Sequence, residues 1–523
     1  MKFIEKIKLF NFRRFDTFEY LVREQRNIFI GDNEAGKSTI LHAVDIVLTG
    51  SKAKVENIGL ESLFNNNAVS EFLGGDKNLH DLPTLKIEIY LNDHGEIQLE
   101  GNNNTDERTC HGLKLVCEPL LEEYGQEIQD ALAPDDALFP YEYYSITFST
   151  FSGQQYTQNR RFLRHILIDS SLIGSEYATR QYTYSLYETH TNLVQRHQKN
   201  HAYRQSKAQF RDTALADLNA IFGNINFDIK NDSKSNLGQD LMITERGIPV
   251  AQMGKGRQCF IKTEFALQQK EGADPLDLIL IEEPENHLSH LNMKRLINCI
   301  EAATQTQIMI ATHSNSVCSR LDLHNAALIS SKSNRPISLS DLPNETANYF
   351  VKAPNNKILE FILSERVVLV EGDAEFMLID GIYSNLFGEN MEDSNIHVIS
   401  VGGTSFKRYM DLAKLLGIKT AVIRDNDGDH QAKCVDNYAE HVNEHIQVFF
   451  DEDDEDRQTL EVCLYQDNQE LCERLFSEGR RTLTVQEYML SNKADAALKI
   501  LETSIDQLVS PEYIRQALAW TRE

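Results

Sequence analysis

Five short runs of consecutive apolar residues each lead into a segment that contains glycine, carboxylate or histidine. They lie at 28–30, 278–281, 308–311, 367–370 and 421–423. Uninterrupted runs of this kind are typical of strands buried on both faces of a parallel sheet, where ligands bind beyond the carboxyl ends. The pattern therefore predicts an α/β chain whose functional groups follow its core strands.

The first run is followed by residues 31–38, GDNEAGKS, a full match to the P-loop pattern G-x-x-x-x-G-K-[ST]. A helix is predicted directly after it, so strand, loop and helix follow in the order that phosphate binding needs. Backbone N–H groups would surround the phosphates, Lys37 would neutralise the terminal ones, and the Ser38 hydroxyl would ligate Mg²⁺. The predicted ATP-binding residues of this loop are Gly31, Asn33, Gly36, Lys37, Ser38 and Thr39.

The second run ends in Glu282-Glu283-Pro284-Glu285, which has the form of a Walker B strand and its acidic end. We expect Glu282 to hold Mg²⁺ through water and Glu283 to orient or deprotonate the attacking water. A buried strand followed by an ordinary acidic turn is the alternative. The P-loop upstream disfavours that alternative, because the paired carboxylates complete its site.

Two further segments extend the predicted nucleotide site. The third run ends in Thr312-His313-Ser314, where the His313 imidazole could reach the γ-phosphate. Upstream, Gly254 and Gly256 open a helical stretch at which backbone amides can approach a phosphate. Each segment alone has an ordinary interpretation, as a structural histidine or a simple turn. Their order relative to the P-loop and the acidic strand favours the nucleotide interpretation.

A second block of carboxylates follows the last two apolar runs. Glu371 comes after 367–370, Glu375 lies one helical turn further on, and Asp425 and Asp427 follow 421–423. Divalent cations prefer several carboxylate oxygens, and two strand ends of a parallel sheet can converge Glu371, Asp425 and Asp427 on Mg²⁺ or Mn²⁺. The alternatives are that Glu375 merely complements the helix dipole and that the aspartates form a plain turn.

The two blocks resemble two known kinds of domain. The P-loop, the distant acidic strand and the opening segment 6–15, KIKLFNFRRF, are similar to the heads of RecF/SMC-type ABC ATPases. In that group the loop that corresponds to Gly254 and Gly256 contacts the nucleotide bound by the opposite subunit. The Glu-Gly-x-x-Glu and Asp-x-Asp motifs resemble the Toprim pattern of topoisomerases, primases and certain nucleases. Their order on one chain resembles the OLD (overcoming lysogenization defect) nucleases, which include the nuclease subunit of the Gabija anti-phage system.

The OLD resemblance covers nearly the whole chain and implies an ATP-regulated, Mg²⁺- or Mn²⁺-dependent DNA endonuclease, often acting in phage defence. It implies that Glu461 is a late metal ligand and that Lys493 stabilises the phosphate in the transition state, although both could be surface residues. The implied catalytic residues are Glu283, His313, Glu371, Asp425, Asp427 and Lys493. The implied metal ligands are Glu371, Glu375, Asp425, Asp427, Glu461 and Ser38.

The resemblance also implies partners. We expect a homodimer or a higher homo-oligomer that binds DNA. Family members act alone, with a helicase, or with a reverse transcriptase and its DNA product, and all three possibilities stay open at this stage.

Composition along the chain suggests four parts of an α/β protein. Residues 1–155 and 223–350 are predicted to be the two halves of an ATPase domain, and 360–523 a Toprim domain with C-terminal helices. Residues 156–222 are polar and nearly free of glycine and proline, which predicts a helical insertion. The insertion resembles the segment that dimerises OLD-family ATPases, with a lobe packed on its own head as the alternative. Three prolines mark the linker: Pro336, Pro343 and Pro354.

Composition and charge refine the expected partners. No run approaches the ~18 apolar residues of a membrane span, and eight scattered cysteines read as reduced thiols, so we expect a cytoplasmic protein.

The net charge of −27 opposes DNA binding, but 451–456 alone holds six carboxylates, in what we interpret as a solvated loop rather than a metal-recruiting one. Basic and aromatic residues interleave at 158–165 and 196–204, where phosphate contacts and a helical interface are equally open interpretations.

Two other classes of function remain possible at this stage. One is an ATP-gated DNA clamp or sensor whose Toprim carboxylates bind metal without cleaving. The other is a Toprim strand-passing or primase-like enzyme, which is disfavoured because no tyrosine-bearing DNA-gate domain is recognisable.

Overall fold

The computed structural model describes most of the 523 residues. The described ranges are 1–93, 95–170, 176–222, 225–232, 235–267, 276–286, 288–314, 317, 321–330, 333–353, 357–403, 405–477 and 483–523. They form two compact units, the first made of residues 1–317 and 325–336 and the second of 318–324 and 337–523.

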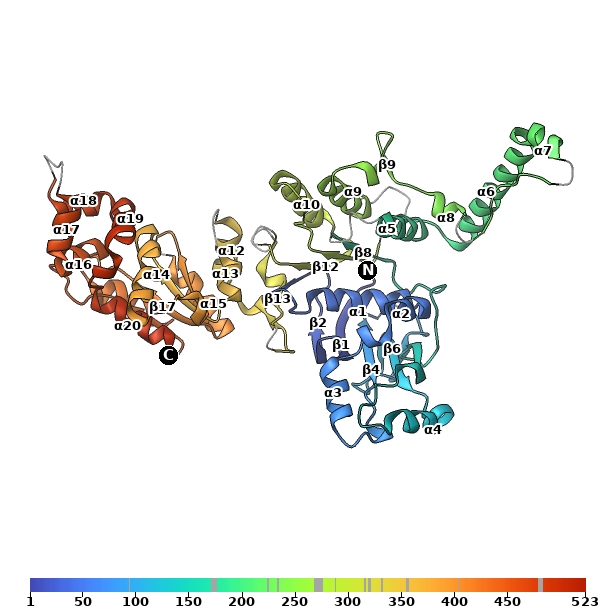
Figure 1. Ribbon diagram of the computed structural model, residues 1–523, viewed down its shortest axis with the longest axis horizontal. Helices are drawn as coiled ribbons and strands as arrows, with labels where there is room; N and C mark the ends of the chain where they lie inside the picture. Colours follow the sequence, from blue (N-terminus) through green and yellow to red (C-terminus); the bar gives the residue numbers. More distant parts are fainter. Residues whose placement is uncertain are drawn as a thin grey trace. The chain divides into compact units, whose positions relative to one another are not determined.

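An antiparallel sheet begins the first unit (Figure 1). Its strands run in the order β2-β1-β4-β6-β5, with β7 also paired to β6. Their bounds are β1 Ile4–Phe12, β2 Phe15–Leu21, β4 Leu85–Leu91, β5 Glu100–Gly101, β6 Cys110–Pro119 and β7 Tyr144–Thr150. Helices α2 Lys52–Ile58, α3 Asn66–Gly74 and α4 Leu121–Leu132 accompany this sheet.

A parallel sheet in the same unit carries the predicted nucleotide motifs. Within the first unit, its strands follow the order β13-β3-β12-β11-β8. Their bounds are β3 Arg26–Ile30, β8 His165–Asp169, β11 Leu278–Glu282, β12 Gln307–Thr312 and β13 Ala326–Leu328. Helix α1 Lys37–Thr49 contacts strands of both sheets, and its apolar side chains share one core with them. The P-loop strand β3 and the acidic strand β11 are therefore separated by β12, and all three end at the same edge.

The predicted helical insertion at 156–222 is wrong for its first part, because residues 165–169 form strand β8 of the parallel sheet. Every residue of His165–Asp169 pairs in register with one residue of β11, so sheet pairing decides the conformation there. The helices of this region are α5 Glu176–Thr189, α6 Leu193–Ala214 and α7 Ala216–Phe222, followed by α8 Leu237–Asp240.

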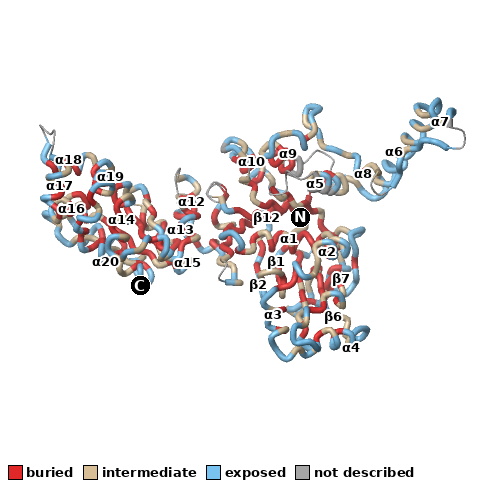
Figure 2. Tube along the Cα trace, viewed as in Figure 1, coloured by how far each residue is buried: buried red, intermediate tan, exposed pale blue. Residues whose placement is uncertain are grey.

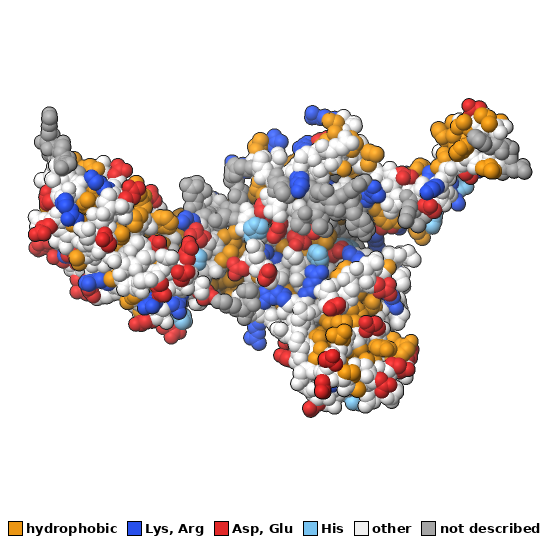
Figure 3. All heavy atoms as spheres, viewed as in Figure 1, with side chains coloured by type: hydrophobic (Ala, Val, Ile, Leu, Met, Phe, Trp, Pro, Cys, Tyr) orange, Lys and Arg blue, Asp and Glu red, His pale blue; other side chains and the backbone are white. Residues whose placement is uncertain are grey.

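Helix α6 is exposed along its length. None of its 22 residues, all of which the structure describes, is buried (Figure 2). Hydrophobic side chains gather over α7 and the end of α6 (Figure 3), among them Phe210, Leu218 and Ile221. We call the segment from α6 through α7 the arm.

The second unit is a smaller α/β fold. Its parallel strands have the order β16-β15-β17-β18, with bounds β15 Arg366–Val370, β16 Ile396–Ser400, β17 Lys419–Ile423 and β18 Ile446–Phe449. Alternate residues of β15 face opposite sides of the sheet, and all of Val367–Val370 are buried, so helices cover both faces. The helices are α12 Asn344–Lys352, α13 Ile358–Leu363, α14 Asp373–Phe387, α15 Phe406–Leu416, α16 Leu460–Asp467, α17 Gln469–Phe476, α18 Val485–Ser491, α19 Lys493–Ser504 and α20 Glu512–Arg522.

The second unit begins before residue 360, the start expected from the prolines. Helices α12 and α13 pack on α15 of this unit, where the rings of Phe350 and Phe361 both contact Tyr409. Thr346 also hydrogen-bonds to Asp411. Pro336 closes a segment of the first unit, Pro343 caps α12, and Pro354 lies outside the described residues.

Candidate functional sites

The P-loop is a tight turn between β3 and α1. The Nζ of Lys37 donates hydrogen bonds to the carbonyl oxygens of Gly31 and Asp32, both at 2.7 Å. A Cβ on Gly31 would lie 2.2 Å from the carbonyl oxygen of Ile329, and Gly36 has a φ of 96°, so both positions require glycine. Burial lowers the pKa of Lys37, while Glu283 and other nearby carboxylates oppose that shift. The loop therefore holds a buried ammonium group at the N-terminus of a helix, as a phosphate site needs.

The acidic end of β11 lies beside this loop. Glu282 is nearly buried, and its Oε2 lies 3.3 Å from Nε2 of His42 on α1. Burial acts to raise the pKa of Glu282, but His42 and the hydrogen-bonded Ser38 hold the pKa below its usual value. Oε2 of Glu282 is nevertheless buried without a well-directed hydrogen bond. A buried carboxylate oxygen beside the P-loop serine and an imidazole fits the donor set that a divalent cation requires.

The histidine after β12 faces the other carboxylates of the acidic turn. Nδ1 of His313 lies 3.4 Å from Oε1 of Glu283 and 3.5 Å from Oε1 of Glu285. Asn286 donates to Oε2 of Glu283 at 2.6 Å, and Thr312 donates to Glu285 at 2.7 Å. Glu283 has a φ of 45°, an unusual conformation for this residue type. The structure thus brings Glu282, Glu283, His313 and Lys37 to one edge of the parallel sheet.

The predicted glycine loop precedes helix α9 Lys255–Leu267. The side chain of Gln258 fastens the turn by donating to the carbonyl oxygens of Ala251 at 3.2 Å and Met253 at 2.7 Å. A Cβ on Gly254 would meet no atom within 4 Å. Gly254 therefore stands at an open helix N-terminus, and Gly256 lies in its first turn.

The second unit gathers three carboxylates around one lysine. They are Glu375 on α14, Asp425 after β17 and Glu461 on α16, with Lys493 at the start of α19. Nζ of Lys493 lies 2.9 Å from Oε2 of Glu461, while Oε1 of Glu461 is buried and accepts no hydrogen bond. Oδ1 of Asp425 accepts one from the backbone N–H of Leu460 at 3.0 Å. We call these four residues the carboxylate cluster.

The residues of the carboxylate cluster shift one another's pKa values. Burial, together with Glu375 and Glu461, raises the pKa of Asp425 to about 8. Burial also raises the pKa of Glu375, with Glu461 contributing, whereas Lys493 lowers it. These carboxylates repel one another, and Oε1 of Glu461 is buried without a hydrogen bond. A bound divalent cation would reduce the repulsion and would supply a partner for that oxygen.

The other two carboxylates predicted to bind metal, Glu371 and Asp427, form ion pairs with an arginine. Arg424 binds Glu371 through Nη1 and Asp427 through Nη2, the latter at 2.6 Å. Arg424 is nearly buried and lies directly before Asp425. The predicted convergence of Glu371, Asp425 and Asp427 thus takes the form of two neighbouring groups, one around Lys493 and one around Arg424.

The acidic loop at 451–456 is ordered by side-chain hydrogen bonds. Asn426 donates to the carbonyl oxygens of Asp451 at 2.8 Å and Asp453 at 2.9 Å, and Arg457 donates to the Asp451 carboxylate at 2.7 Å. His430 pairs with Asp454 at 3.0 Å. The loop is therefore fastened to the strand end that carries the predicted metal ligands.

Part of the basic and aromatic stretches serves contacts within the chain. Arg161 and Arg196 both bind the carboxylate of Glu188 on α5. This favours the helical-interface interpretation for these two arginines.

The structure adds three residues that lie outside the sequence motifs. His42 and Asp169 lie at the nucleotide site, and Arg424 lies beside the carboxylate cluster. Asp169 ends β8 and pairs in register with Glu282 of β11. His42 follows Ser38 by one helical turn on the same face of α1. The spacing of Ser38 and His42 on one helix is a sequence signal from which His42 could be predicted. Asp169 could not be predicted without recognising that residues 165–169 form a strand.

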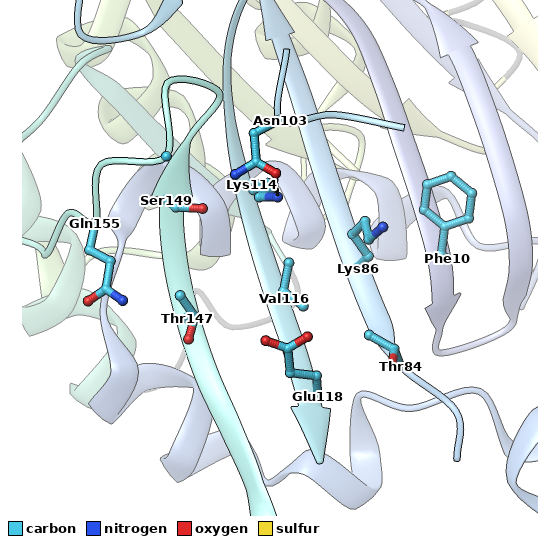
Figure 4. A pocket seen from close by; sticks show the side chains of 11 residues that line it. Phe10, Thr84, Lys86, Asn103, Lys114, Val116, Glu118, Thr147, Ser149 and Gln155 are labelled. Atoms are coloured by element: carbon cyan, nitrogen blue, oxygen red, sulfur yellow. Dashed lines mark hydrogen bonds between the residues drawn. The ribbon is translucent and has the colours of Figure 1, made fainter. Parts of the chain in front are cut away.

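An open hollow of about 590 Å³ lies elsewhere, on the face of the antiparallel sheet (Figure 4). Lys86 and Lys114 enter it from neighbouring strands β4 and β6. Burial and the charge of Lys86 lower the pKa of Lys114, which donates to Asn103 at 2.6 Å. No P-loop or carboxylate-cluster residue lines this hollow.

Fold and sites together define a P-loop ATPase domain joined to a Toprim domain with a carboxylate cluster. The chain belongs to the family described as AAA domain, putative AbiEii toxin, Type IV TA system, whose model matches residues 26–319. The model described as overcoming lysogenization defect protein-like, TOPRIM domain, matches residues 362–427. The predicted OLD resemblance is thereby confirmed.

Individual relatives are more distant. The chain is 26% identical over 196 residues to Old nuclease of Escherichia phage P2, a match covering 34% of this chain and 33% of that protein. Among solved structures, the C-terminal region of the Xanthomonas campestris pv. campestris OLD protein is 21% identical, with a TM-score of 0.23, over 30% of this chain and 94% of that one. The SMC head domain from Thermotoga maritima is 13% identical, with a TM-score of 0.30, over 64% of this chain and 97% of that one.

No helix among the described residues is long and apolar enough to cross a membrane.

Proposed function

We propose that this chain is an ATP-regulated, divalent-metal-dependent DNA endonuclease that acts in the cytoplasm in anti-phage defence. The observation that carries the proposal is the carboxylate cluster, in which Glu375, Asp425 and Glu461 surround Lys493 on a chain that also holds a P-loop ATPase site. The Toprim match and the likeness to Old nuclease support the same conclusion.

At the ATPase site, each motif residue has a distinct role. Lys37 is already desolvated and positioned by two carbonyl oxygens, so its charge is available to the terminal phosphates. Ser38 and Glu282 would hold Mg²⁺ with the nucleotide. Glu283 would position the attacking water, and His313, whose Nδ1 faces Glu283, would fix the orientation of that carboxylate beside the γ-phosphate.

At the Toprim site, Glu375, Asp425 and Glu461 would hold Mg²⁺ or Mn²⁺. A bound divalent ion makes water a better nucleophile and stabilises charge on the departing oxygen. Lys493 places a cation where negative charge develops on the phosphate. Glu371 and Asp427, both bound to Arg424, fix the neighbouring loops and can add ligand oxygens when Arg424 shifts.

The large negative charge does not exclude DNA as the substrate. Carboxylates concentrate at the carboxylate cluster, where a bound cation would reduce their field, and at 451–456, where Arg457 pairs with Asp451. Lysines on the antiparallel sheet, such as Lys86 and Lys114, supply cations elsewhere on the chain. Contacts from such residues to the phosphate backbone would be salt-dependent.

We infer a homodimer or higher homo-oligomer from two features. The arm exposes apolar side chains, as expected of an interface between chains. Gly254 stands at an open helix N-terminus that would complete the nucleotide pocket of a second chain. The family resemblance leaves three possibilities open: the chain acts alone, with a helicase, or with a reverse transcriptase and its DNA.

A plasmid-nicking assay tests the proposal. Purified protein is incubated with supercoiled plasmid and Mg²⁺ or Mn²⁺, with and without ATP, and Asp425→Asn serves as the inactive control. The proposal expects metal-dependent nicking that Asp425→Asn abolishes and that ATP alters. Binding of DNA without nicking under any of these conditions would favour the second candidate, an ATP-gated clamp or sensor.

That second candidate draws on one observation. Arg424 already neutralises Glu371 and Asp427, so part of the carboxylate set is balanced without a metal ion.

A further inference from the structure

The ATPase centre contains a group of potential metal ligands that the P-loop motifs do not include. The ligand atoms of His42, Asp169 and Glu282 all lie within 4.8 Å of one another. They come from three elements, α1, β8 and β11, that are distant in sequence. The pairing of β8 with β11 sets Asp169 opposite Glu282, and the pitch of α1 sets His42 on the same face as Ser38.

The spacing of these atoms suits a bound ion. Nε2 of His42 lies 3.3 Å from Oε2 of Glu282. Two ligands at right angles around an ion with bonds of about 2.1 Å lie roughly 3 Å apart. Oε2 of Glu282 is also buried and accepts no well-directed hydrogen bond, so it keeps a lone pair that a cation can use.

We propose that His42, Asp169 and Glu282, with Ser38, form a cation site of mixed nitrogen and oxygen ligands that prefers transition-metal ions to Mg²⁺ and binds them without nucleotide. The inference goes beyond the proposed function and holds whether or not the Toprim domain cleaves DNA.

The chemistry of the donor set determines the preference. Mg²⁺ favours oxygen ligands and gives up water reluctantly, so a set with an imidazole nitrogen offers it little. Imidazole nitrogen is a good ligand for first-row transition metals, whose affinity for such mixed sites rises along the series from Mn²⁺. The preference therefore depends on His42.

An ordinary ion pair between a protonated His42 and Glu282 is the competing explanation. A protonated imidazole cannot coordinate a metal, so the two explanations differ in one observable. Only a metal site brings the ring nitrogen of His42 into direct contact with a bound ion.

Pulsed electron paramagnetic resonance of the full-length, nucleotide-free protein loaded with Mn²⁺ tests this. We expect a ¹⁴N coupling to bound Mn²⁺ in the parent protein and its loss in His42→Asn. His430→Asn is the matched control, because His430 also pairs with a carboxylate and is equally exposed, 29% against 30% for His42. The coupling should persist in that control.

Titration adds a second readout. Even outer partners of metal ligands change affinity by about 10- to 100-fold, so His42→Asn should weaken this class of Mn²⁺ binding by at least tenfold. Mg²⁺ should compete less well against Mn²⁺ in the parent than in His42→Asn. Asp169→Asn should weaken binding yet keep the ¹⁴N coupling at saturation, which separates ligand loss from misfolding. Absence of ¹⁴N coupling in the parent, or its persistence in His42→Asn, overturns the proposal.

Discussion

Nζ of Lys493 lies 2.9 Å from Oε2 of Glu461, which pairs an exposed lysine of α19 with a carboxylate of α16 whose side chain is only 3% exposed. Burial acts against the charge of Lys493, but Glu461, Asp425 and Glu375 together raise its pKa. The lysine thus stays charged beside carboxylates that repel one another. In the proposed mechanism, this contact would let one cation balance the site until a metal ion and a phosphate bind.

Replacing Lys493 tests that role. Lys493→Met should reduce DNA cleavage by about 10²-fold or more, because the cation that faces the developing phosphate charge is lost. ATP turnover should not change. Lys499→Met is the matched control, since Lys499 lies on the same helix and donates to the carbonyl oxygen of Leu475. Plasmid nicking and ATP turnover are measured side by side, and equal nicking by the two variants would remove Lys493 from the catalytic site.

Two variants should separate ATP binding from ATP hydrolysis. Lys37→Ala should weaken ATP binding, because the buried ammonium group between the P-loop carbonyls is lost. Glu283→Gln should bind ATP normally and hydrolyse it at least about tenfold more slowly, since the amide keeps the shape of the side chain without its basicity. Glu301→Gln, at the end of α10 His290–Ala302, is the control. Binding is measured by calorimetry and turnover by phosphate release, and full turnover in Glu283→Gln would contradict the assigned role.

The arm should carry the contact between chains. Phe210 and Ile221 are 52% and 71% exposed, so Phe210→Glu with Ile221→Glu should convert the oligomer to a monomer. ATP turnover should fall with it, because each pocket would lack the Gly254 loop of a second chain. Light scattering gives the mass, and Gln209→Glu on α6 is the control. A monomer that keeps full ATP turnover would refute the shared pocket.

The buried carboxylate of Asp45 predicts how stability depends on pH. Asp45 on α1 binds Lys54 and lies 3.1 Å from Nε2 of His165. Burial acts to raise the pKa of Asp45, but Lys54 and His165 hold it far below the usual 3.8. A depressed pKa contributes stability above pH 3.8 that is lost as the pH falls below that value. Asp45→Asn should therefore destabilise the protein by about 3 kcal/mol at pH 7.

The difference between parent and Asp45→Asn should shrink below pH 4, where Asp45 takes up a proton in the unfolded parent but not in the folded one. Urea unfolding from pH 7 to pH 3 measures it. Asp212→Asn removes an exposed pair with Arg211 and should change stability little at any pH. A difference that stays constant down to pH 3 would mean that packing, rather than charge, explains the Asp45 effect.

The sequence by itself determined the motifs that form both candidate sites. A P-loop needs a fixed order of glycine, lysine and serine between strand and helix, so residues 31–38 identify it without tertiary information. Apolar runs that end in carboxylates likewise mark core strands, because parallel strands are buried on both faces. The strands at β3, β11, β12, β15 and β17 were predictable for that reason.

Tertiary structure decided which of these side chains meet. Glu371 and Asp427 bind Arg424, whereas Asp425 joins Glu375 and Glu461, because α16 and α19 bring Glu461 and Lys493 to one side of the strand end. Asp169 reaches Glu282 only because β8 pairs with β11. The apolar run 166–168 before Asp169 has the form of the other core strands, but it lies at the edge of a long polar, helix-like segment, and only the pairing with β11 shows that it is a strand. Strand pairing and helix packing join residues far apart in sequence, and such contacts leave no local pattern to read.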